Sequence, residues 1–204
     1  MKPERTRAHA TRRAALGATA FAVSLLPLRR GSVGPREQEL FRAVNGLPDS
    51  LYVPAWFVMQ LGTVGAAPVA AAFAWTRGDR RLAARLLVAG VITWGASKVA
   101  KRVTQRPRPV VLLQDARVRG REATGLGFPS GHAGVAVALG IGAWHRLDHR
   151  GHLAAATLMP IVGATRVYVG AHLPLDAVSG AALGLTLDAL VDWVLAGQAL
   201  ETSD

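Results

Sequence analysis

The 204-residue chain contains no cysteine, which excludes a disulfide framework, a thiolate metal site and a cysteine nucleophile. Acidic residues are scarce as well: 13 Asp and Glu stand against 24 Lys and Arg, and the formal net charge is +11. Charged residues make up 18% of the chain, less than soluble domains usually carry, and aromatic residues make up 6%. Half of the residues are apolar, as in closely packed membrane helices. This composition predicts a membrane protein.

The basic residues are distributed in a way that argues against nucleic-acid binding. They lie at the ends of apolar segments, around residues 5–13, 29–30, 77–85 and 101–108, and are not interleaved with aromatic residues. Such clusters are typical of membrane topology together with one anion site. We therefore expect the bilayer as a partner and no nucleic acid.

Apolar segments approach the length of about 20 residues that a bilayer span needs. They lie at residues 54–76, 82–100, 131–147, 153–170 and 174–197. A shorter one, at residues 14–28, is flanked by paired arginines that can reach both interfaces. A twin-arginine export signal is the rival interpretation, but "RRG" stands where a signal would have its cleavage site. We expect a retained span and an all-α, six-helix transmembrane bundle with the site at one membrane face.

The chain divides into a basic N-terminus with the first span (1–30), an interfacial segment (31–53), a transmembrane unit (54–197) and a short tail (198–204). In the interfacial segment, Leu40, Phe41 and Val44 lie on one face of a predicted helix that Gly46 and Pro48 end. The positive-inside rule places the N-terminus and the basic links near residues 77–85 and 146–152 in the cytoplasm. The arginine-rich segment 101–130 then lies outside, and its charges need another explanation.

The first polar motif is Lys101, followed after six residues by Arg108 and Pro109, in "KRVTQRPRP". Pro107 and Pro109 end the helix, so the chain should leave the span in an extended form that holds Arg106 and Arg108 outward. Guanidinium groups bind phosphate oxygens in pairs, and lysine supplies a compact charge. This segment is therefore a candidate anion site.

The second motif is "PSGH", residues 129–132, at the start of an apolar segment. Ser130 is placed to cap the helix, and Gly131 lets the backbone approach a ligand closely. The free amides and the positive end of the helix dipole favour an anion there. His132 would point into the same space.

The third motif is Arg166, then His172 after five residues and Asp176 after three more. Gly170 suits the end of one helix and Pro174 the first turn of the next. His172 and Asp176 are then about one helical turn apart, so the carboxylate can orient the imidazole. A histidine oriented in this way suits a nucleophile or a base.

Each motif alone is typical of a membrane flank, a helix cap or a structural pair, but all three fall on the same predicted side of the bilayer. Together they closely resemble the type 2 phosphatidic acid phosphatase (PAP2) superfamily, which also includes vanadium haloperoxidases and bacterial lipid pyrophosphate phosphatases. The resemblance covers about residues 50–195, so the unit 54–197 is expected to be the catalytic domain. The third motif of the family usually begins Ser-Arg, and Thr165-Arg166 keeps the hydroxyl here.

The resemblance implies a role for each motif residue. Lys101, Arg108 and Arg166 would bind the phosphoryl oxygens, with help from Ser130 and the Gly131 amide. Three fixed cations would then do what Mg²⁺ does in other phosphoryl-transfer enzymes. No metal and no cofactor is therefore expected.

The resemblance also implies a covalent mechanism. His172 would attack phosphorus and form a phosphohistidine, Asp176 would orient His172, and His132 would protonate the leaving group. The expected protein is an integral-membrane phosphatase of the cell membrane, with its site outside the cytoplasm. Its substrate would be a lipid phosphate or diphosphate, such as phosphatidic acid, phosphatidylglycerophosphate or a polyprenyl diphosphate.

Two other functions use the same residues. A vanadate-dependent haloperoxidase would bind vanadate in the anion pocket, but the haloperoxidases of the family are soluble and six apolar spans argue against it. A lipid-binding membrane protein without catalysis would not need the intact set of catalytic residues.

Two further clusters are not assigned to the site. His145, His149 and His152 lie in a basic loop on the opposite face without Cys or Glu, so we interpret them as a topology signal. Asp188 and Asp192 lie near the cytoplasmic end of the last span, where we expect a hydrated helix terminus.

Overall fold

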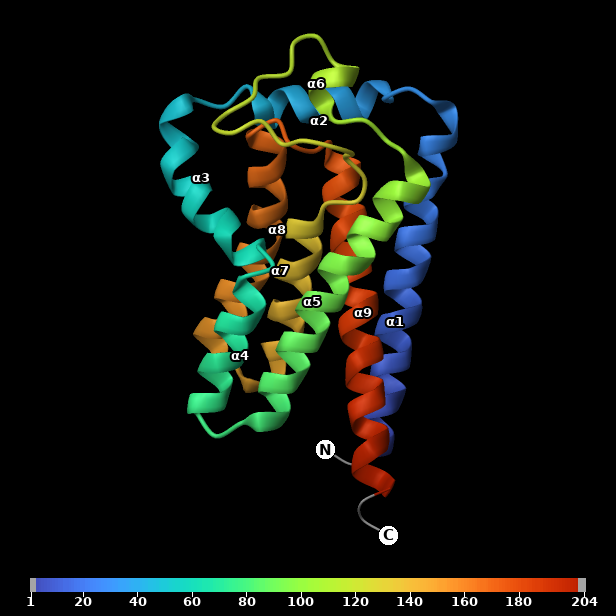
Figure 1. Cartoon of the computed structure of the whole chain (residues 1–204), viewed down its shortest axis with the longest axis vertical. Coiled ribbons are helices and arrows are strands. Elements are labelled where there is room, and N and C mark those ends of the chain that lie inside the picture. The colour runs from blue at the N-terminus through green and yellow to red at the C-terminus, as the bar shows by residue number, and fades with distance from the viewer. Residues whose placement is uncertain (1–2, 202–204) are drawn as a thin grey trace.

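In the computed structural model, which describes residues 3–201, every regular element is a helix, so the predicted all-α class is confirmed for this part of the chain. Figure 1 shows long helices running side by side, with short helices and loops gathered across one end. The bundle helices are α1 (Pro3–Leu25), α4 (Ala66–Thr76), α5 (Arg80–Thr104), α7 (Gly131–Ala143), α8 (His149–Tyr168) and α9 (Pro174–Glu201). The shorter elements are η1 (Pro27–Arg30), α2 (Pro35–Asn45), η2 (Asp49–Leu51), α3 (Tyr52–Met59), η3 (Gln60–Gly62), α6 (Pro109–Leu112) and η4 (Trp144–Arg146).

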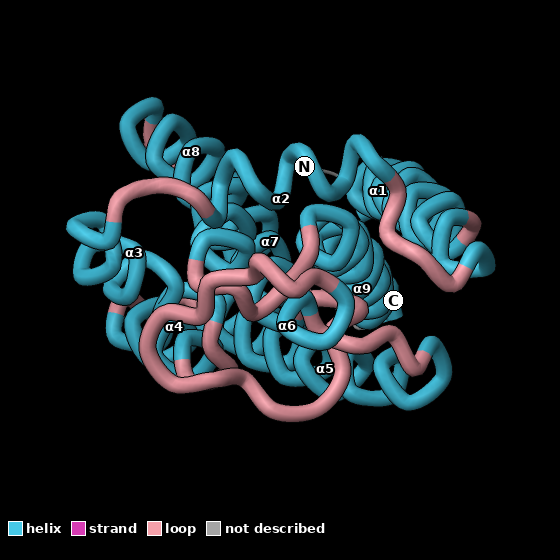
Figure 2. The backbone as a smooth tube through the Cα atoms, turned by 90° about the horizontal axis from the view of Figure 1, so that it is seen from above, coloured by secondary structure: helices cyan, strands magenta, loops and turns pink. Residues whose placement is uncertain are grey.

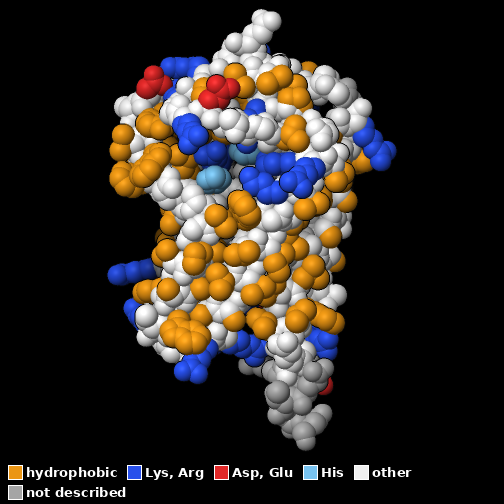
Figure 3. All heavy atoms as spheres, viewed as in Figure 1, with side chains coloured by type: hydrophobic (Ala, Val, Ile, Leu, Met, Phe, Trp, Pro, Cys, Tyr) orange, Lys and Arg blue, Asp and Glu red, His pale blue; other side chains and the backbone are white. Residues whose placement is uncertain are grey.

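Two helices are long and apolar enough to cross a membrane within the described range. They cover Arg80–Leu112 and Pro174–Gln198, and a bent pair from Asp49 to Thr76 makes a third if it is counted as one span. Figure 3 shows a belt of apolar side chains between two ends rich in Lys and Arg. The helices α1, α7 and α8 overlap the other predicted spans, and the count of six remains a prediction. Residues 1–2 of the predicted N-terminus and 202–204 of the predicted tail lie outside the described residues.

The predicted span 54–76 is not one straight helix. It consists of α3, η3 and α4, and its two halves meet at an angle of 67°. Gly62 lies at the break, and a Cβ there would come within 2.4 Å of the His132 carbonyl oxygen. The bend therefore brings the chain into direct contact with the start of α7, where the second motif begins.

The crossing of α7 and α9 also depends on glycine. A Cβ on Gly180 would lie 2.1 Å from the carbonyl oxygen of Ser130, so no larger residue fits between the two backbones. Small residues permit this close approach of helices in membranes. The contact fixes the first turn of α7 against α9, near the start of which Asp176 lies.

The end of α5 follows the predicted course. Gln105 ends the helix in a left-handed conformation with φ 51°, and Arg108 is extended with φ −80° and ψ 163°. Pro109 then opens α6, where its missing N–H costs no hydrogen bond. The first motif therefore leaves the bundle at the end that carries the loops.

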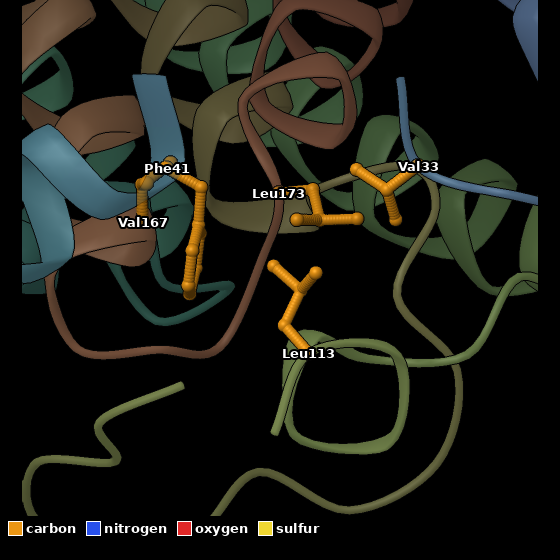
Figure 4. Packing of buried hydrophobic residues seen from close by; sticks show 5 residues of the cluster. All are labelled: Val33, Phe41, Leu113, Val167 and Leu173. Atoms are coloured by element: carbon orange, nitrogen blue, oxygen red, sulfur yellow. The ribbon is translucent and has the colours of Figure 1, made fainter. Parts of the chain in front are cut away.

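The predicted interfacial helix is α2, which lies across the ends of the bundle helices in both views (Figures 1 and 2). Its inward face differs from the predicted one, because Leu40 is exposed while Phe41 is buried and Val44 packs beside it. Phe41 belongs to an apolar cluster that holds α2 to the loops and to α8 (Figure 4). The members of this cluster are Val33, Phe41, Leu113, Val167 and Leu173.

The interpretation of Asp188 and Asp192 as hydrated was wrong, because both are buried. Arg13 of α1 donates to Asp188 at 2.8 Å and to Asp192 at 2.6 Å. Arg85 of α5 donates to both Asp188 oxygens and lies 2.9 Å from Asp192. Charges buried in a membrane helix bundle are stable when they are paired in this way. Ion pairs therefore join α1, α5 and α9, and Arg13 does not extend to an interface.

Candidate active site

The three motifs lie at the end of the bundle that carries the loops. The first runs from the last turn of α5 into the segment after it, the second opens α7, and the third joins α8 to α9. Figure 3 shows histidine side chains beside Lys and Arg in a hollow just below this end. His132 lies within electrostatic range of Arg166, His172, Lys101 and Arg108. The structure therefore brings the predicted site residues of all three motifs together.

Ser130 is the N-cap residue of α7, as predicted. Its Oγ accepts from the Ala133 amide at 3.4 Å, and its own amide donates to the Asp176 carbonyl oxygen at 2.7 Å. Gly131 has a packing role, because a Cβ there would lie 2.9 Å from the Ser97 Oγ of α5. The helix N-terminus, which favours anions, is thus fixed against both α5 and α9.

Lys101 and Arg108 hold the loops over the site. Lys101 Nζ donates to the carbonyl oxygens of Leu126 at 3.0 Å and Pro129 at 2.7 Å, and also to that of Gly127. Arg108 donates to the carbonyl oxygen of Ala171 at 2.6 Å and to two carbonyls of the loop before α7. Both predicted phosphate ligands therefore bond backbone carbonyls in this structure.

Arg166 has a donor that no protein acceptor reaches. Its Nη1 lies 3.0 Å from the Met59 sulfur, a weak acceptor, and its Nε is buried without a hydrogen-bond partner. A buried donor left without an acceptor costs free energy. This arrangement fits an anionic ligand at Arg166.

A cavity of about 230 Å³ opens beside Arg108 and Arg166. Tyr52, Trp56 and Met59 form an apolar part of its wall. His172 does not line this cavity and is only 3% exposed. The cavity thus reaches two of the predicted cations, while the predicted nucleophile is not part of its wall.

His172 is buried in the turn between α8 and α9. Its amide donates to the Arg166 carbonyl oxygen at 3.1 Å, and its Nδ1 lies 3.5 Å from Asp176 Oδ2 without a hydrogen bond. Burial holds the pKa of His172 well below its usual value, and the charges of Lys101, Arg166 and Arg108 lower that pKa further. The imidazole is therefore neutral near pH 7 and keeps the lone pair that a nucleophile needs.

Arg106 does not extend outward as the two prolines had suggested. It is buried, donates to Asp176 Oδ1 at 2.7 Å and donates to Glu37 Oε2 at 2.7 Å. Neither Arg106 nor Glu37 was among the predicted site residues. The sequence shows Glu37 only as an acidic residue in the first turn of a predicted helix. That position does not indicate that its partner is Arg106, 69 residues away.

The described residues contain no group of three or more His, Asp or Glu side chains placed to hold a metal ion. In the basic loop, the His152 ring stacks on Trp144 and its Nε2 lies 2.9 Å from the Trp144 carbonyl oxygen. His152 therefore has a structural role next to η4.

Comparisons with known proteins agree with the three motifs. The family model of the PAP2 superfamily matches residues 81–197, more than half of the chain, and no curated protein matches. The structure of LpxE from Aquifex aeolicus is 22% identical with a TM-score of 0.65, over 80% of this chain and 94% of that one. A transmembrane PAP2-type phosphatidylglycerolphosphate phosphatase from Bacillus subtilis is 22% identical with a TM-score of 0.62, over 93% of this chain and 98% of that one. The chain therefore belongs to the PAP2 superfamily, as its three motifs predicted.

Proposed function

We propose that the protein is an integral-membrane phosphatase that removes a phosphate group from a lipid phosphate or diphosphate. The observation that carries this proposal is a neutral, buried His172 beside Arg166, which has a buried donor free for an anion. Phosphoryl transfer depends mainly on positioning and charge stabilisation, and this cluster supplies both. The similar Bacillus protein is named for the lipid phosphate on which it acts.

In the proposed first step, His172 attacks phosphorus. Its Nδ1 faces Asp176, so Nε2 is the nitrogen available for the new bond. The phosphorus–oxygen bond to the lipid breaks, and His132, protonated once the anionic phosphate is bound beside it, gives its proton to the departing oxygen. In the second step His132 takes a proton from water, and the hydroxide displaces His172 and releases phosphate.

Binding of the phosphate would replace protein contacts that exist in this structure. Lys101 and Arg108 would exchange backbone carbonyl oxygens for phosphoryl oxygens, which are stronger acceptors for cations. Arg166 would gain an acceptor for Nε. The loop before α7 is then released from both side chains, which would open a path from the cavity to His172.

The cavity favours an amphipathic substrate. Arg108 and Arg166 form a cationic part of its wall, and Trp56 and Met59 form an apolar part. Trp56 and Phe57 are exposed at this end of the bundle, and aromatic side chains are enriched where membranes meet water. We propose that the lipid chain stays in the bilayer while its phosphate enters from the outer face of the cell membrane.

Phosphate release from purified protein in detergent tests the function. The panel is phosphatidic acid, phosphatidylglycerophosphate, a polyprenyl diphosphate and the chainless ester nitrophenyl phosphate, with and without EDTA. We expect release from at least one lipid in EDTA, inhibition by vanadate, which imitates five-coordinate phosphorus, and no release by His172→Ala. Failure to hydrolyse any member of the panel, or activity that requires added Mg²⁺, would contradict the proposal.

A further inference from the structure

Asp176, the residue that would orient His172, is itself held by a chain of buried charges. Asp176 Oδ1 accepts from Arg106 Nη1 at 2.7 Å, and Arg106 Nη2 donates to Glu37 Oε2 at 2.7 Å. The other Glu37 oxygen accepts from the Leu175 amide at 3.1 Å, next to Asp176 in the chain. The contacts thus form a closed path that begins at Asp176 and ends at Leu175, both in the first turn of α9.

The three charged side chains are largely closed to solvent. Their exposed fractions are 0% for Asp176, 9% for Arg106 and 14% for Glu37. Burial of an isolated carboxylate is costly, and an ion pair offsets that cost when its geometry is good and its remaining groups are bonded. Arg106 meets this condition because its Nη1 pairs with Asp176 and its Nη2 pairs with Glu37.

The three side chains of Asp176, Arg106 and Glu37 together carry a single negative charge. Two carboxylates and one guanidinium leave −1, and the other Asp176 oxygen, Oδ2, lies 3.5 Å from the His172 Nδ1. When Nε2 bonds to phosphorus, the imidazole becomes positively charged. A fixed negative charge on its other side stabilises that state without rearrangement, which is how preorganised electrostatics accelerates a reaction.

From this geometry we infer that Arg106 and Glu37 are positioning residues for His172, acting through Asp176; the inference rests on the proposed function. Arg106 keeps the Asp176 carboxylate ionised and turned toward the imidazole. Glu37 holds Arg106 and fixes the first turn of α9. The helix α2 is therefore part of the catalytic apparatus and not only an interfacial helix.

The apolar cluster under α2 supports this role. Phe41, one helical turn after Glu37, packs in the same cluster as Leu173, the neighbour of His172 (Figure 4). The Leu173 amide also donates to Asp176 Oδ2 at 2.9 Å. Packing and charge thus hold α2, His172 and Asp176 in one arrangement.

The inference predicts a separation between binding and catalysis. Lys101, Arg108 and Arg166 carry the predicted contacts to phosphate, and none of them bonds Arg106 or Glu37 in this structure. Loss of Arg106 should therefore slow the formation of phosphohistidine without weakening the binding of a phosphate group. A residue that only stabilised the fold would show no such separation.

The experiment compares Arg106→Gln, Arg106→Lys and Glu37→Gln with the matched control Arg85→Gln. Arg85 is also a buried arginine with a 9% exposed side chain between two carboxylates, but it lies in the cluster with Asp188 and Asp192. For each variant, kcat and KM are measured on nitrophenyl phosphate together with the inhibition constant of vanadate and the melting temperature. Nitrophenyl phosphate has no lipid chain, so effects on lipid access do not enter.

We expect Arg106→Gln to lower kcat by about 10–100-fold, the range found when the hydrogen-bond partner of a metal-binding histidine is lost. KM and the vanadate constant should stay near the wild-type values. Arg106→Lys should restore part of kcat because a positive charge returns, and Glu37→Gln should show a smaller loss. Arg85→Gln should lower the melting temperature and leave kcat of the folded protein unchanged.

Several results would overturn the inference. One is an Arg106→Gln variant whose vanadate binding weakens as much as its kcat; another is an Arg85→Gln variant with an equal loss of kcat. If Arg106→Gln does not fold, unchanged kcat in both Arg106→Lys and Glu37→Gln has the same consequence. A wild-type protein without activity on any phosphate ester overturns the proposed function and this inference together, whereas an active wild type with unaffected variants overturns the inference alone.

Discussion

The imidazole of His172 lies 3.5 Å from the carboxylate of Asp176, yet the two do not form a hydrogen bond. Asp176 instead accepts from Arg106 and from the Leu173 amide, and His172 Nδ1 is left without a partner. Catalytic hydrogen bonds are often long before substrate binds and shorten in the reacting complex. We expect this contact to shorten when His172 becomes positively charged.

The two histidines should respond differently to the leaving group. His172→Ala removes the nucleophile and should lower kcat by about a thousandfold or more on every substrate, without phosphoenzyme. His132→Ala removes only protonation of the leaving group, a contribution of about 10²–10⁴-fold that matters most when that group is a poor one. Rates on an alkyl phosphate and on nitrophenyl phosphate test this; equal losses on both in His132→Ala would contradict the assignment.

The pH dependence of His172 follows from its lowered pKa. In the unfolded chain a histidine takes up a proton near pH 6.5, whereas the folded state resists it until a lower pH. Between the lowered pKa of His172 and about pH 6.5, the folded protein thus binds fewer protons than the unfolded chain. The titration of His172 therefore lowers stability as pH drops below about 6.5 and does not affect it above that pH. Histidine-selective NMR, with His172→Ala to identify the signal, should show a neutral imidazole at about pH 6. A protonated His172 at that pH would count against its role as nucleophile.

The orientation of the site can be tested with single cysteines because the native chain has none. Gln114 follows α6, Arg150 lies in the first turn of α8, and both are exposed. Figure 1 shows α6 at the end of the bundle that carries the loops, whereas α8 begins toward the other end. The positive-inside rule places the basic loop around residue 150 in the cytoplasm. Gln114→Cys should react with an impermeant maleimide in intact cells, and Arg150→Cys only after lysis. The reverse pattern would place the site in the cytoplasm.

The paired arginines of α1 should differ in their effect on stability. Arg13 binds Asp188 and Asp192, whereas the neighbouring Arg12 is exposed. Arg13→Gln leaves buried carboxylates short of a charged partner and should lower the free energy of unfolding by about 1–3 kcal/mol. Arg12→Gln should have little effect. Melting temperatures in detergent test this, and equal stability of the two variants would show that the α1 ion pairs do not stabilise the bundle.

The positions of the motifs were accessible from sequence because they depend on local chemistry. Ser130 caps α7 since its side chain reaches an amide three residues away, and the prolines at 107 and 109 end α5 wherever the chain lies. The helix at 35–45 was predicted from short-range patterns of the same kind. Its inward face was predicted less well, because the exposure of Leu40 depends on what packs beneath α2.

The partners of the charged residues were decided only by the tertiary structure. Arg106 meets Glu37 and Asp176 across 69 and 70 residues of chain, and Asp188 meets Arg13 across 175. No spacing rule relates residues so far apart, because their proximity arises from the packing of α1, α2, α5 and α9. The sequence by itself determined which chemistry the chain carries, since Lys101, Arg108, Arg166 and the two histidines stand in recognisable motifs. The tertiary structure determined which charges are buried together, because desolvation makes an ion pair necessary only where the folded chain excludes water.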